Sequence, residues 1–169
     1  MTSPVRTPDV RFLMAHPAHL IACGFGSGLS PVAPGTFGTL FGWLSFLTIE
    51  RVLSGPALLV FLVFAFILGV LVCDRTGRAL GVIDHGAIVW DEIVPFWIVL
   101  AITPSDWHWQ LAAFLLFRLF DITKPSPANY FDQHVKNGFG VMMDDVVAAF
   151  YTLLALALGK RLLDAFGLF

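Results

Sequence analysis

The strongest constraint on the fold is the apolar run ALLVFLVFAFILGVLVC at residues 57–73, which contains no charged residue. A helix needs about 17–25 apolar residues to cross the hydrocarbon core of a bilayer, so this run predicts a transmembrane helix. The composition agrees, because 57% of the 169 residues are hydrophobic and only 13% are charged. A soluble domain of this length does not need so apolar a composition, and we expect an integral membrane protein.

Further apolar stretches are separated by turns or charged residues, and they lie at residues 40–53, 87–102, 107–120 and 141–159. Residues 12–23 are too short for a span and are interrupted by His16, Pro17 and His19, which favours an interfacial or re-entrant helix. Polar or Gly/Ser/Pro-rich sequence at residues 24–39 and 121–140 predicts loops. We therefore predict an all-α, polytopic membrane helical bundle that forms one domain, with about five apolar spans, some of them short.

The N-terminal arm, residues 1–11, is polar and does not have the pattern of a secretory signal sequence. We expect it to be mature and cytoplasmic. Five crossings from there place Arg51, Lys160 and Arg161 outside and a larger set of basic residues inside: Arg6, Arg11, Arg75, Arg78, Lys124 and Lys136. This distribution agrees with the positive-inside rule, and it brings the polar segments together at the cytoplasmic surface.

Several classes of function are disfavoured. The formal net charge of −2 provides no basic field, so nucleic acid is not an expected partner. Cys23 and Cys73 lack the spacing of a zinc pair and are too few for a disulfide framework, so we interpret both as small apolar fillers. The histidines are scattered without the spacing of metal ligands, and we assign none of them to a metal.

Two acidic pairs, Asp91-Glu92 and Asp144-Asp145, lie inside apolar stretches, and Asp121 follows a third. Carboxylates at membrane depth cost several kcal/mol unless they are paired, hydrated or bound to a cation, so they indicate a functional site. Five such groups cannot all stay ionised close together without a cation, and oxygen ligands favour Mg²⁺ over zinc. We predict catalytic roles for these acids and Lys124, with the metal held by Glu92, Asp121, Asp144 and Asp145.

Basic and hydroxyl side chains complete a predicted phosphate site. Lys124 and Arg118 supply positive charge, and the glycines and hydroxyls of residues 24–39 let backbone amides approach an anionic oxygen. The predicted phosphate or headgroup ligands are Ser27, Gly28, Ser30, Thr36, Gly38, Thr39, Arg118 and Lys124.

Structural roles compete with each functional one. A Gly-rich segment is more often a turn or a helix-packing point than a phosphate cradle, and Arg118 can simply extend toward lipid headgroups. One acid of each pair can stabilise a helix N-terminus, a role that suits Asp91 and Asp145 best. A small transporter or channel can also carry intramembrane acids.

Three blocks of the sequence carry most of its polar and glycine-rich motifs. In chain order they are GFGSGLSPVAPGTFGT at residues 24–39, DHGAIVWDEIV at 84–94 and FRLFDITKPSPANYFDQHVKNGFGVMMDD at 117–145. Together they resemble the bacterial phosphatidylglycerophosphatase A family. The resemblance implies a Mg²⁺-dependent lipid phosphatase of the inner membrane, with a cytoplasmic active site. Its substrate would be phosphatidylglycerophosphate, and its products phosphatidylglycerol and inorganic phosphate, in phospholipid biosynthesis.

The mechanism and the competing classes stay open at this stage. Either a water activated by the ion attacks phosphorus, or one of Asp91, Asp121 and Asp144 forms an aspartyl-phosphate. The alternatives to this phosphatase are the transporter or channel and another lipid phosphomonoesterase or phosphotransferase. A CDP-alcohol phosphotransferase ranks behind these, because its long Asp-rich signature is missing from the sequence.

Overall fold

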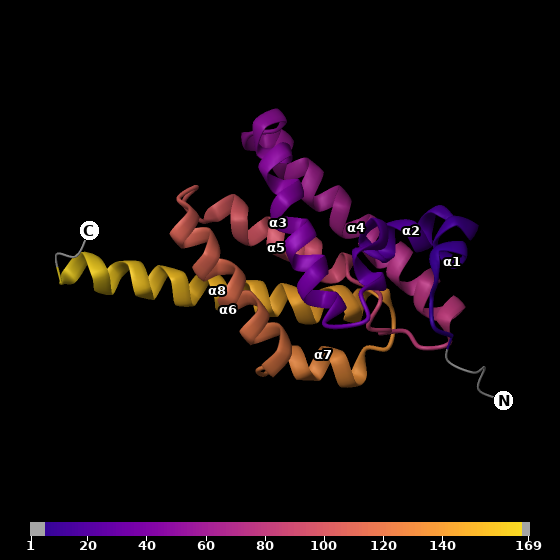
Figure 1. The fold of residues 1–169 in the computed structure, drawn as a ribbon. Helices are drawn as coiled ribbons and strands as arrows, with labels where there is room; N and C mark the ends of the chain where they lie inside the picture. The colour runs from indigo at the N-terminus through magenta and orange to yellow at the C-terminus, as the bar shows by residue number, and fades with distance from the viewer. Residues whose placement is uncertain (1–5, 167–169) are drawn as a thin grey trace.

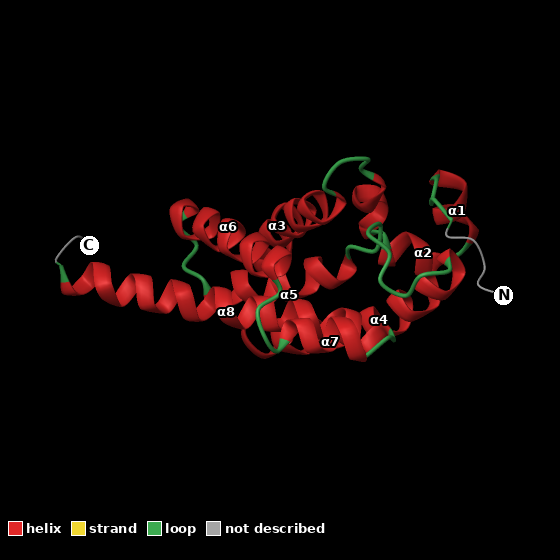
Figure 2. Ribbon diagram, turned by 90° about the horizontal axis from the view of Figure 1, so that it is seen from below, coloured by secondary structure: helices red, strands yellow, loops and turns green. Residues whose placement is uncertain are grey.

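The structure is a computed structural model that describes residues 6–166, apart from the side chain of Asp132. The first five residues of the predicted polar arm lie outside the described residues. The described part is helical and has no strand (Figures 1 and 2), with these elements in order: α1 (Val10–Ala15), α2 (Pro17–Ala22), the 3-10 helix η1 (Gly24–Leu29), α3 (Pro34–Val52), α4 (Gly55–Leu80), α5 (Trp90–Ile102), α6 (Trp107–Thr123), α7 (Ala128–His134) and α8 (Gly138–Ala165). The all-α prediction is confirmed.

Local sequence signals explain where these helices begin and end. The side chains of Asp9, Asp106 and Asn137 accept backbone N–H groups at the starts of α1, α6 and α8, which is the usual role of an N-cap. Helix α3 starts at Pro34, whose fixed φ suits the first helical turn. Helix α4 ends at Gly81, which adopts a left-handed conformation with a φ of +84°.

The N-terminal region differs from its prediction in two ways. The single helix expected at residues 12–23 is two short helices, α1 and α2, because His16 is extended between them and Pro17 starts the second. The loop expected at residues 24–39 is wrong for its last six residues, since α3 already begins at Pro34. Proline interrupts a helix interior but is favourable in the first turn of a helix. The apolar stretch at 40–53 is therefore the later part of α3, which is longer than expected.

The predicted polar loop at residues 121–140 is also partly wrong. Helix α6 continues to Thr123, α7 forms within the loop, and α8 begins at Gly138 because Asn137 caps it. Helix α5, by contrast, is shorter than the apolar stretch expected at 87–102, because the helix begins only at Trp90. Helix α7 is stabilised by packing on α8 rather than by an apolar run of its own.

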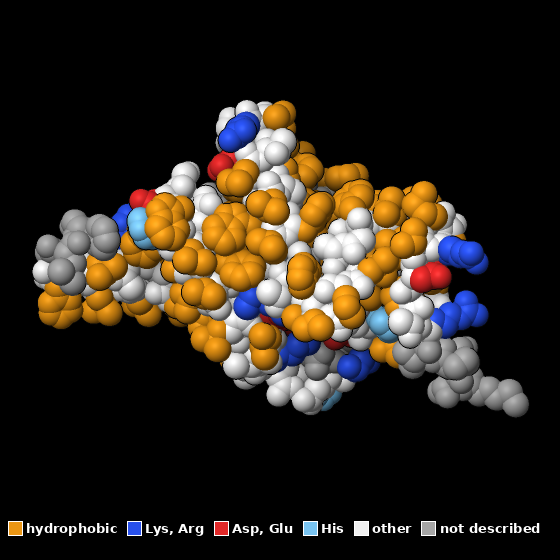
Figure 3. Space-filling view, viewed as in Figure 1, with side chains coloured by type: hydrophobic (Ala, Val, Ile, Leu, Met, Phe, Trp, Pro, Cys, Tyr) orange, Lys and Arg blue, Asp and Glu red, His pale blue; other side chains and the backbone are white. Residues whose placement is uncertain are grey.

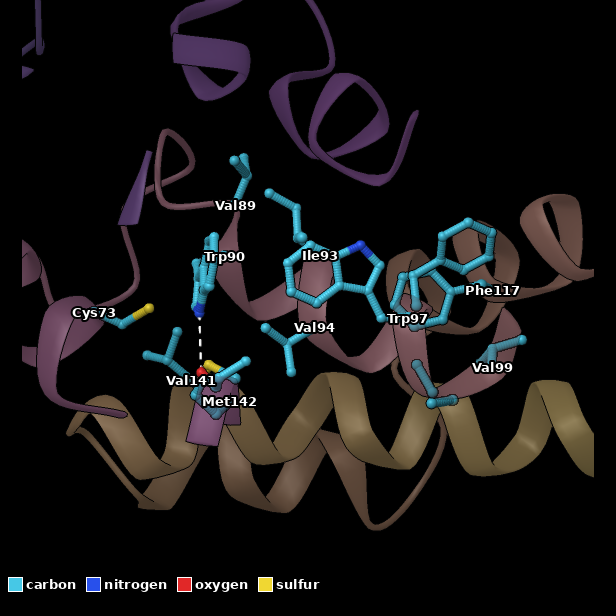
Figure 4. Packing of buried hydrophobic residues seen from close by; sticks show 14 of the residues in the cluster. Cys73, Val89, Trp90, Ile93, Val94, Trp97, Val99, Phe117, Val141 and Met142 are labelled. Atoms are coloured by element: carbon cyan, nitrogen blue, oxygen red, sulfur yellow. Dashed lines mark hydrogen bonds between the residues drawn. The ribbon is translucent and has the colours of Figure 1, made fainter. Parts of the chain in front are cut away.

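Helix α5 forms the centre of the core, between α3 on one side and α8 on the other, with α4 and α6 beside it (Figure 1). Figure 4 shows Trp90, Ile93, Val94 and Trp97 of α5 packed inside this core. The indole Nε1 of Trp90 donates to the Ala65 carbonyl at 3.1 Å, so this buried polar group has a partner. Trp90 and Trp97 are both buried and lie in the core.

Two helices, α4 and α8, are long and apolar enough to cross a membrane, by length and composition, within the part of the chain that the structure describes. Large apolar side chains of α4 are exposed, among them Leu59, Val60, Val63 and Phe64. Hydrophobic atoms cover much of the face seen in Figure 3, while charged side chains lie at its upper tip, at its left and right ends and along its lower edge. The structure thus suggests a membrane protein, and the remaining spans of the predicted five stay a prediction.

Candidate active site

Charged side chains from α5, α6 and α8 converge with the start of α3 and with the segment that connects α4 and α5. Asp91 and Glu92 lie in the first turn of α5, where the helix dipole favours negative charge. Asp144 and Asp145 lie two turns into α8, and both are buried. Asp121 lies near the end of α6. The predicted convergence of the acidic residues is therefore seen in the described structure.

Arg118 forms the first of two cationic centres, which we call the arginine centre. Its Nη1 is 3.4 Å from Glu92 Oε1, and it also forms an ion pair with Asp121, one turn along α6. The same nitrogen donates to the Thr39 hydroxyl at 3.3 Å, and that hydroxyl donates to the Gly35 carbonyl. The side chain of Arg118 is only 15% exposed, so this centre is largely shielded from solvent.

Lys124 forms the second centre, which we call the lysine centre. Its Nζ donates to Asp144 Oδ2 at 2.7 Å and lies 3.8 Å from Asp84 Oδ2. Lys124 ends α6 in a left-handed conformation, with a φ of +42°, and this conformation turns the chain into the following loop. Its side chain is 30% exposed, twice the value for Arg118, so the lysine centre is the more accessible one.

The two centres are parts of one site. Asp121 interacts electrostatically with Glu92 of the arginine centre and with Asp144 of the lysine centre. Asp91 and Asp145 lie close enough to interact with both sets of acids. Carboxylates thus outnumber the two cations at the site, and an additional cation would favour their ionised forms.

The predicted phosphate ligands from the Gly-rich block have varied surroundings. Thr39 lies at the arginine centre, and Thr36 is half-buried in the first turn of α3. Ser27 and Ser30 donate to the nearby carbonyls of Gly24 and Val32. A Cβ on Gly28 would collide with the Ala87 carbonyl, and one on Gly38 would collide with Val89, so close packing requires glycine at both positions.

Two site residues were absent from the sequence prediction. A Cβ at Gly35 would collide with Glu92 Oε1 and with the guanidinium of Arg118, so this glycine leaves the space that their ion pair occupies. Asp84 contacts Lys124 from the segment between α4 and α5. Both residues lie inside the sequence blocks that carry the family resemblance, and membership of these blocks is the sequence feature that could have identified them as site residues.

The cysteines do not contribute a nucleophile to this site. Both are free and buried, as expected of apolar fillers. Burial raises the pKa of Cys23 to about 11, so this thiol is protonated at neutral pH and is a poor nucleophile.

The donor chemistry of the site suits a hard divalent cation. Carboxylate oxygens are the ligands that Mg²⁺ prefers, and Glu92 Oε2 is buried without a hydrogen-bond partner. Among the side chains that the structure describes, no group of three Asp, Glu, His or Cys residues is arranged to hold a metal ion. Arg118 and Lys124 contact several of the carboxylates instead, so binding of an ion requires these side chains to rearrange.

The fold and the site together define an all-helical protein with apolar exposed helices and a shielded cluster of carboxylates, arginine and lysine. Such a cluster combines ligands for a divalent cation with positive groups for an anionic substrate.

Comparison with known proteins identifies the family. The family model described as Phosphatidylglycerophosphatase A matches residues 20–160. A Phosphatidylglycerophosphatase A of Haemophilus influenzae is 49% identical over 87% of this chain and 91% of its own length. A protein of the same name from Escherichia coli is 43% identical over 88% of each chain. The chain belongs to the phosphatidylglycerophosphatase A family, and it is a phosphatase.

A third relative has a different name. A Putative phosphatidylinositol-3-phosphatase of Bacteroides thetaiotaomicron is 38% identical over 83% of this chain and 92% of its own length. No solved structure matches the chain.

Proposed function

We propose that this phosphatase hydrolyses the terminal phosphomonoester of phosphatidylglycerophosphate, giving phosphatidylglycerol and inorganic phosphate in phospholipid biosynthesis. The observation that carries the proposal is the convergence of Arg118 and Lys124 with buried carboxylates from α5, α6 and α8. The names of the two most identical relatives described above support the choice of lipid.

In the proposed net reaction, the bond between phosphorus and the glycerol oxygen breaks, the hydroxide of one water molecule joins phosphorus, and the remaining proton of that water goes to the glycerol oxygen. Lys124 neutralises negative charge on the phosphoryl oxygens, and Arg118 supplies further positive charge for the anionic headgroup. The partly buried position of both side chains strengthens these interactions relative to bulk water. Asp144 and Asp84 hold the ammonium group of Lys124 in place. The products are the same whether water attacks phosphorus directly or hydrolyses an aspartyl-phosphate formed first by Asp91, Asp121 or Asp144.

Mg²⁺ is the proposed cofactor. Glu92, Asp121, Asp144 and Asp145 would hold it, and the unpartnered Oε2 of Glu92 is an oxygen already available for it. A bound Mg²⁺ supplies positive charge that polarises the phosphoryl oxygens.

The proposed setting is the bacterial inner membrane, with several crossings and the site facing the cytoplasm. The apolar exposed faces of α4 and α8 support membrane embedding. The acyl chains of the lipid would stay in the bilayer while its phosphates enter the site at the level of the headgroups.

The direct test is phosphate release by the purified protein in detergent, from phosphatidylglycerophosphate and from phosphatidate, with Mg²⁺ and with excess EDTA. We expect Mg²⁺-dependent release from phosphatidylglycerophosphate. Phosphatidylinositol 3-phosphate belongs in the same assay, because of the name of the third relative. No release from phosphatidylglycerophosphate by folded protein would refute the proposed substrate, and release unaffected by EDTA would refute the proposed cofactor.

The roles of the acids are tested by Glu92→Gln, Asp121→Asn and Asp144→Asn. Each change keeps the size of the side chain but removes its negative charge, and we expect turnover to fall by at least about 100-fold. The thermal unfolding midpoint should change little. Loss of folding in all three variants would show that these acids are structural.

A further inference from the structure

Arg118 and Lys124 differ in depth, in partners and in chemistry. We propose that they bind different phosphates of the same lipid: Arg118 binds the phosphodiester next to the diacylglycerol, and Lys124 binds the terminal phosphomonoester. This inference rests on the proposed function and deepens it, because it explains how a lipid with two phosphates is distinguished from one with a single phosphate.

Each cation has its own set of ligands. Arg118 is held by Glu92, Asp121 and Thr39, whereas Lys124 is held by Asp144 and Asp84. Among the described ion pairs, no carboxylate contacts both cations. They therefore form separate centres, which Asp121 links through its interactions with both sets of acids.

The two centres lie at different levels along α6. Arg118 precedes Lys124 by six residues, which corresponds to about 9 Å along a helix axis. Arg118 is flanked by Phe117, which is buried, and by Leu119, which is exposed, whereas Lys124 lies at the helix end where the polar loop begins. With the end of α6 at the cytoplasmic surface, Arg118 is the deeper of the two cations.

The substrate presents its phosphates in the same order. Its phosphodiester is attached directly to the diacylglycerol and is therefore nearer the bilayer interior. Its phosphomonoester lies beyond a second, three-carbon glycerol and therefore points toward water. A lipid anchored by its acyl chains would bring the diester to Arg118 and the monoester to Lys124.

The chemistry of each side chain suits its assigned group. A phosphodiester has two non-bridging oxygens, which match the paired donors of a planar guanidinium, and Arg118 Nε is a buried donor without a partner. The ammonium of Lys124 is a compact charge that can follow the reacting phosphoryl group as its geometry changes.

The test is a comparison of kcat/KM on phosphatidylglycerophosphate and on phosphatidate, which lacks the diester, for wild type, Arg118→Lys and Lys124→Arg. Both changes preserve the positive charge that the surrounding acids need, so the fold should be kept. We expect Arg118→Lys to lower kcat/KM on phosphatidylglycerophosphate by about 10- to 100-fold, and to lower it on phosphatidate by at least tenfold less. Lys124→Arg should lower both values in similar proportion.

A second measurement covers the case in which phosphatidate is turned over too slowly to compare. Phosphatidylglycerol carries the diester without the monoester, so it should inhibit the wild type by occupying the arginine centre. The inhibition constant should rise about tenfold or more in Arg118→Lys and stay near the wild-type value in Lys124→Arg.

Two results would overturn the inference while leaving the proposed function intact. One is a proportional loss on both lipids in Arg118→Lys, together with unchanged inhibition by phosphatidylglycerol. The other is a wild-type enzyme that hydrolyses phosphatidate as efficiently as phosphatidylglycerophosphate. Failure of the wild type to hydrolyse either lipid would instead refute the proposed function, and this inference with it.

Discussion

Single atoms decide the geometry of the arginine centre. Gly35 lies in the first turn of α3, where its missing Cβ leaves room for Glu92 and Arg118. Both side chains are mostly shielded, at 12% and 15% exposure, so they have little freedom to move aside. The ion pair between them therefore depends on a glycine that belongs to neither partner.

We expect Gly35→Ala to lower kcat by about tenfold or more, because its Cβ would displace the Glu92–Arg118 pair, and small misplacements of catalytic groups are costly. Alanine is the better helix former by about 1 kcal/mol, so α3 itself should not be weakened. Steady-state kinetics on phosphatidylglycerophosphate measure the effect. Gly86→Ala is the matched control, since a Cβ at Gly86 meets nothing within 4 Å. Equal activity in both variants would contradict this prediction.

Asp84 acts on the lysine centre through Lys124, so it is a positioning residue. Asp84→Asn should reduce kcat by about tenfold with little change in KM, since Lys124 loses one of the charges that hold it. The side chain of Asp84 is 36% exposed, and stability should change by about 0.5 kcal/mol or less. Asp84→Glu should restore part of the activity, and Asp164→Asn, at an exposed site near the end of α8, should have none of these effects. An Asp84→Asn enzyme with wild-type kcat would refute the role.

At the scale of elements, the short N-terminal helices are tied to the bundle by a buried polar contact. His19 Nδ1 of α2 lies 3.0 Å from the Thr76 hydroxyl of α4, which donates to the Ala18 carbonyl. The ring of Phe12 stacks on His19, with 4.2 Å between centroids. A contact between an imidazole and a hydroxyl thus joins α2 to α4. A hydrogen bond fixes the relative orientation of the two helices more tightly than contact between two apolar side chains would.

This contact makes stability depend on pH. Burial lowers the pKa of His19, and the nearby charges of His16 and Arg75 lower it further. The His19 side chain therefore binds a proton more readily in the unfolded chain than in the folded one. Its contribution to the free energy of unfolding is present above the unfolded pKa of about 6.5 and is lost as the pH falls below that value. We expect the free energy of unfolding in detergent to fall from pH 7 to pH 5. His19→Gln should reduce this dependence, and His134→Gln, at an exposed site, should not; identical pH profiles for both would exclude His19 as the cause.

At the scale of the whole molecule, a shielded charged site is combined with an extensive apolar surface on α4. Helix α4 exposes a continuous set of large aliphatic and aromatic side chains, which is costly in water and favourable in lipid. The carboxylates are shielded between α5, α6 and α8, where cations offset part of their charge. The molecule therefore combines a lipid-compatible exterior with a site suited to a phosphorylated headgroup.

The proposed orientation predicts the accessibility of its two ends. In a chain with Cys23 and Cys73 replaced by alanine, a Lys160→Cys variant should react with a membrane-impermeant maleimide in intact cells. An Arg78→Cys variant should react only after permeabilisation, because it lies at the other end of the apolar helices. Labelling in the reverse pattern would invert the proposed topology.

The helical class, the approximate positions of the apolar helices and the identity of the charged residues could be predicted from the sequence, although α3 begins six residues before the apolar stretch at 40–53. These follow from contiguous residues, because helix formation and membrane partitioning respond to local composition. The tertiary structure decided that Arg118 contacts Thr39, 79 residues away, that Asp84 contacts Lys124, and that Gly35 makes space for an ion pair. It also decided that α7 forms, since that helix packs on α8. Such contacts join residues distant in the chain, and their geometry depends on how whole helices pack, which no local pattern encodes.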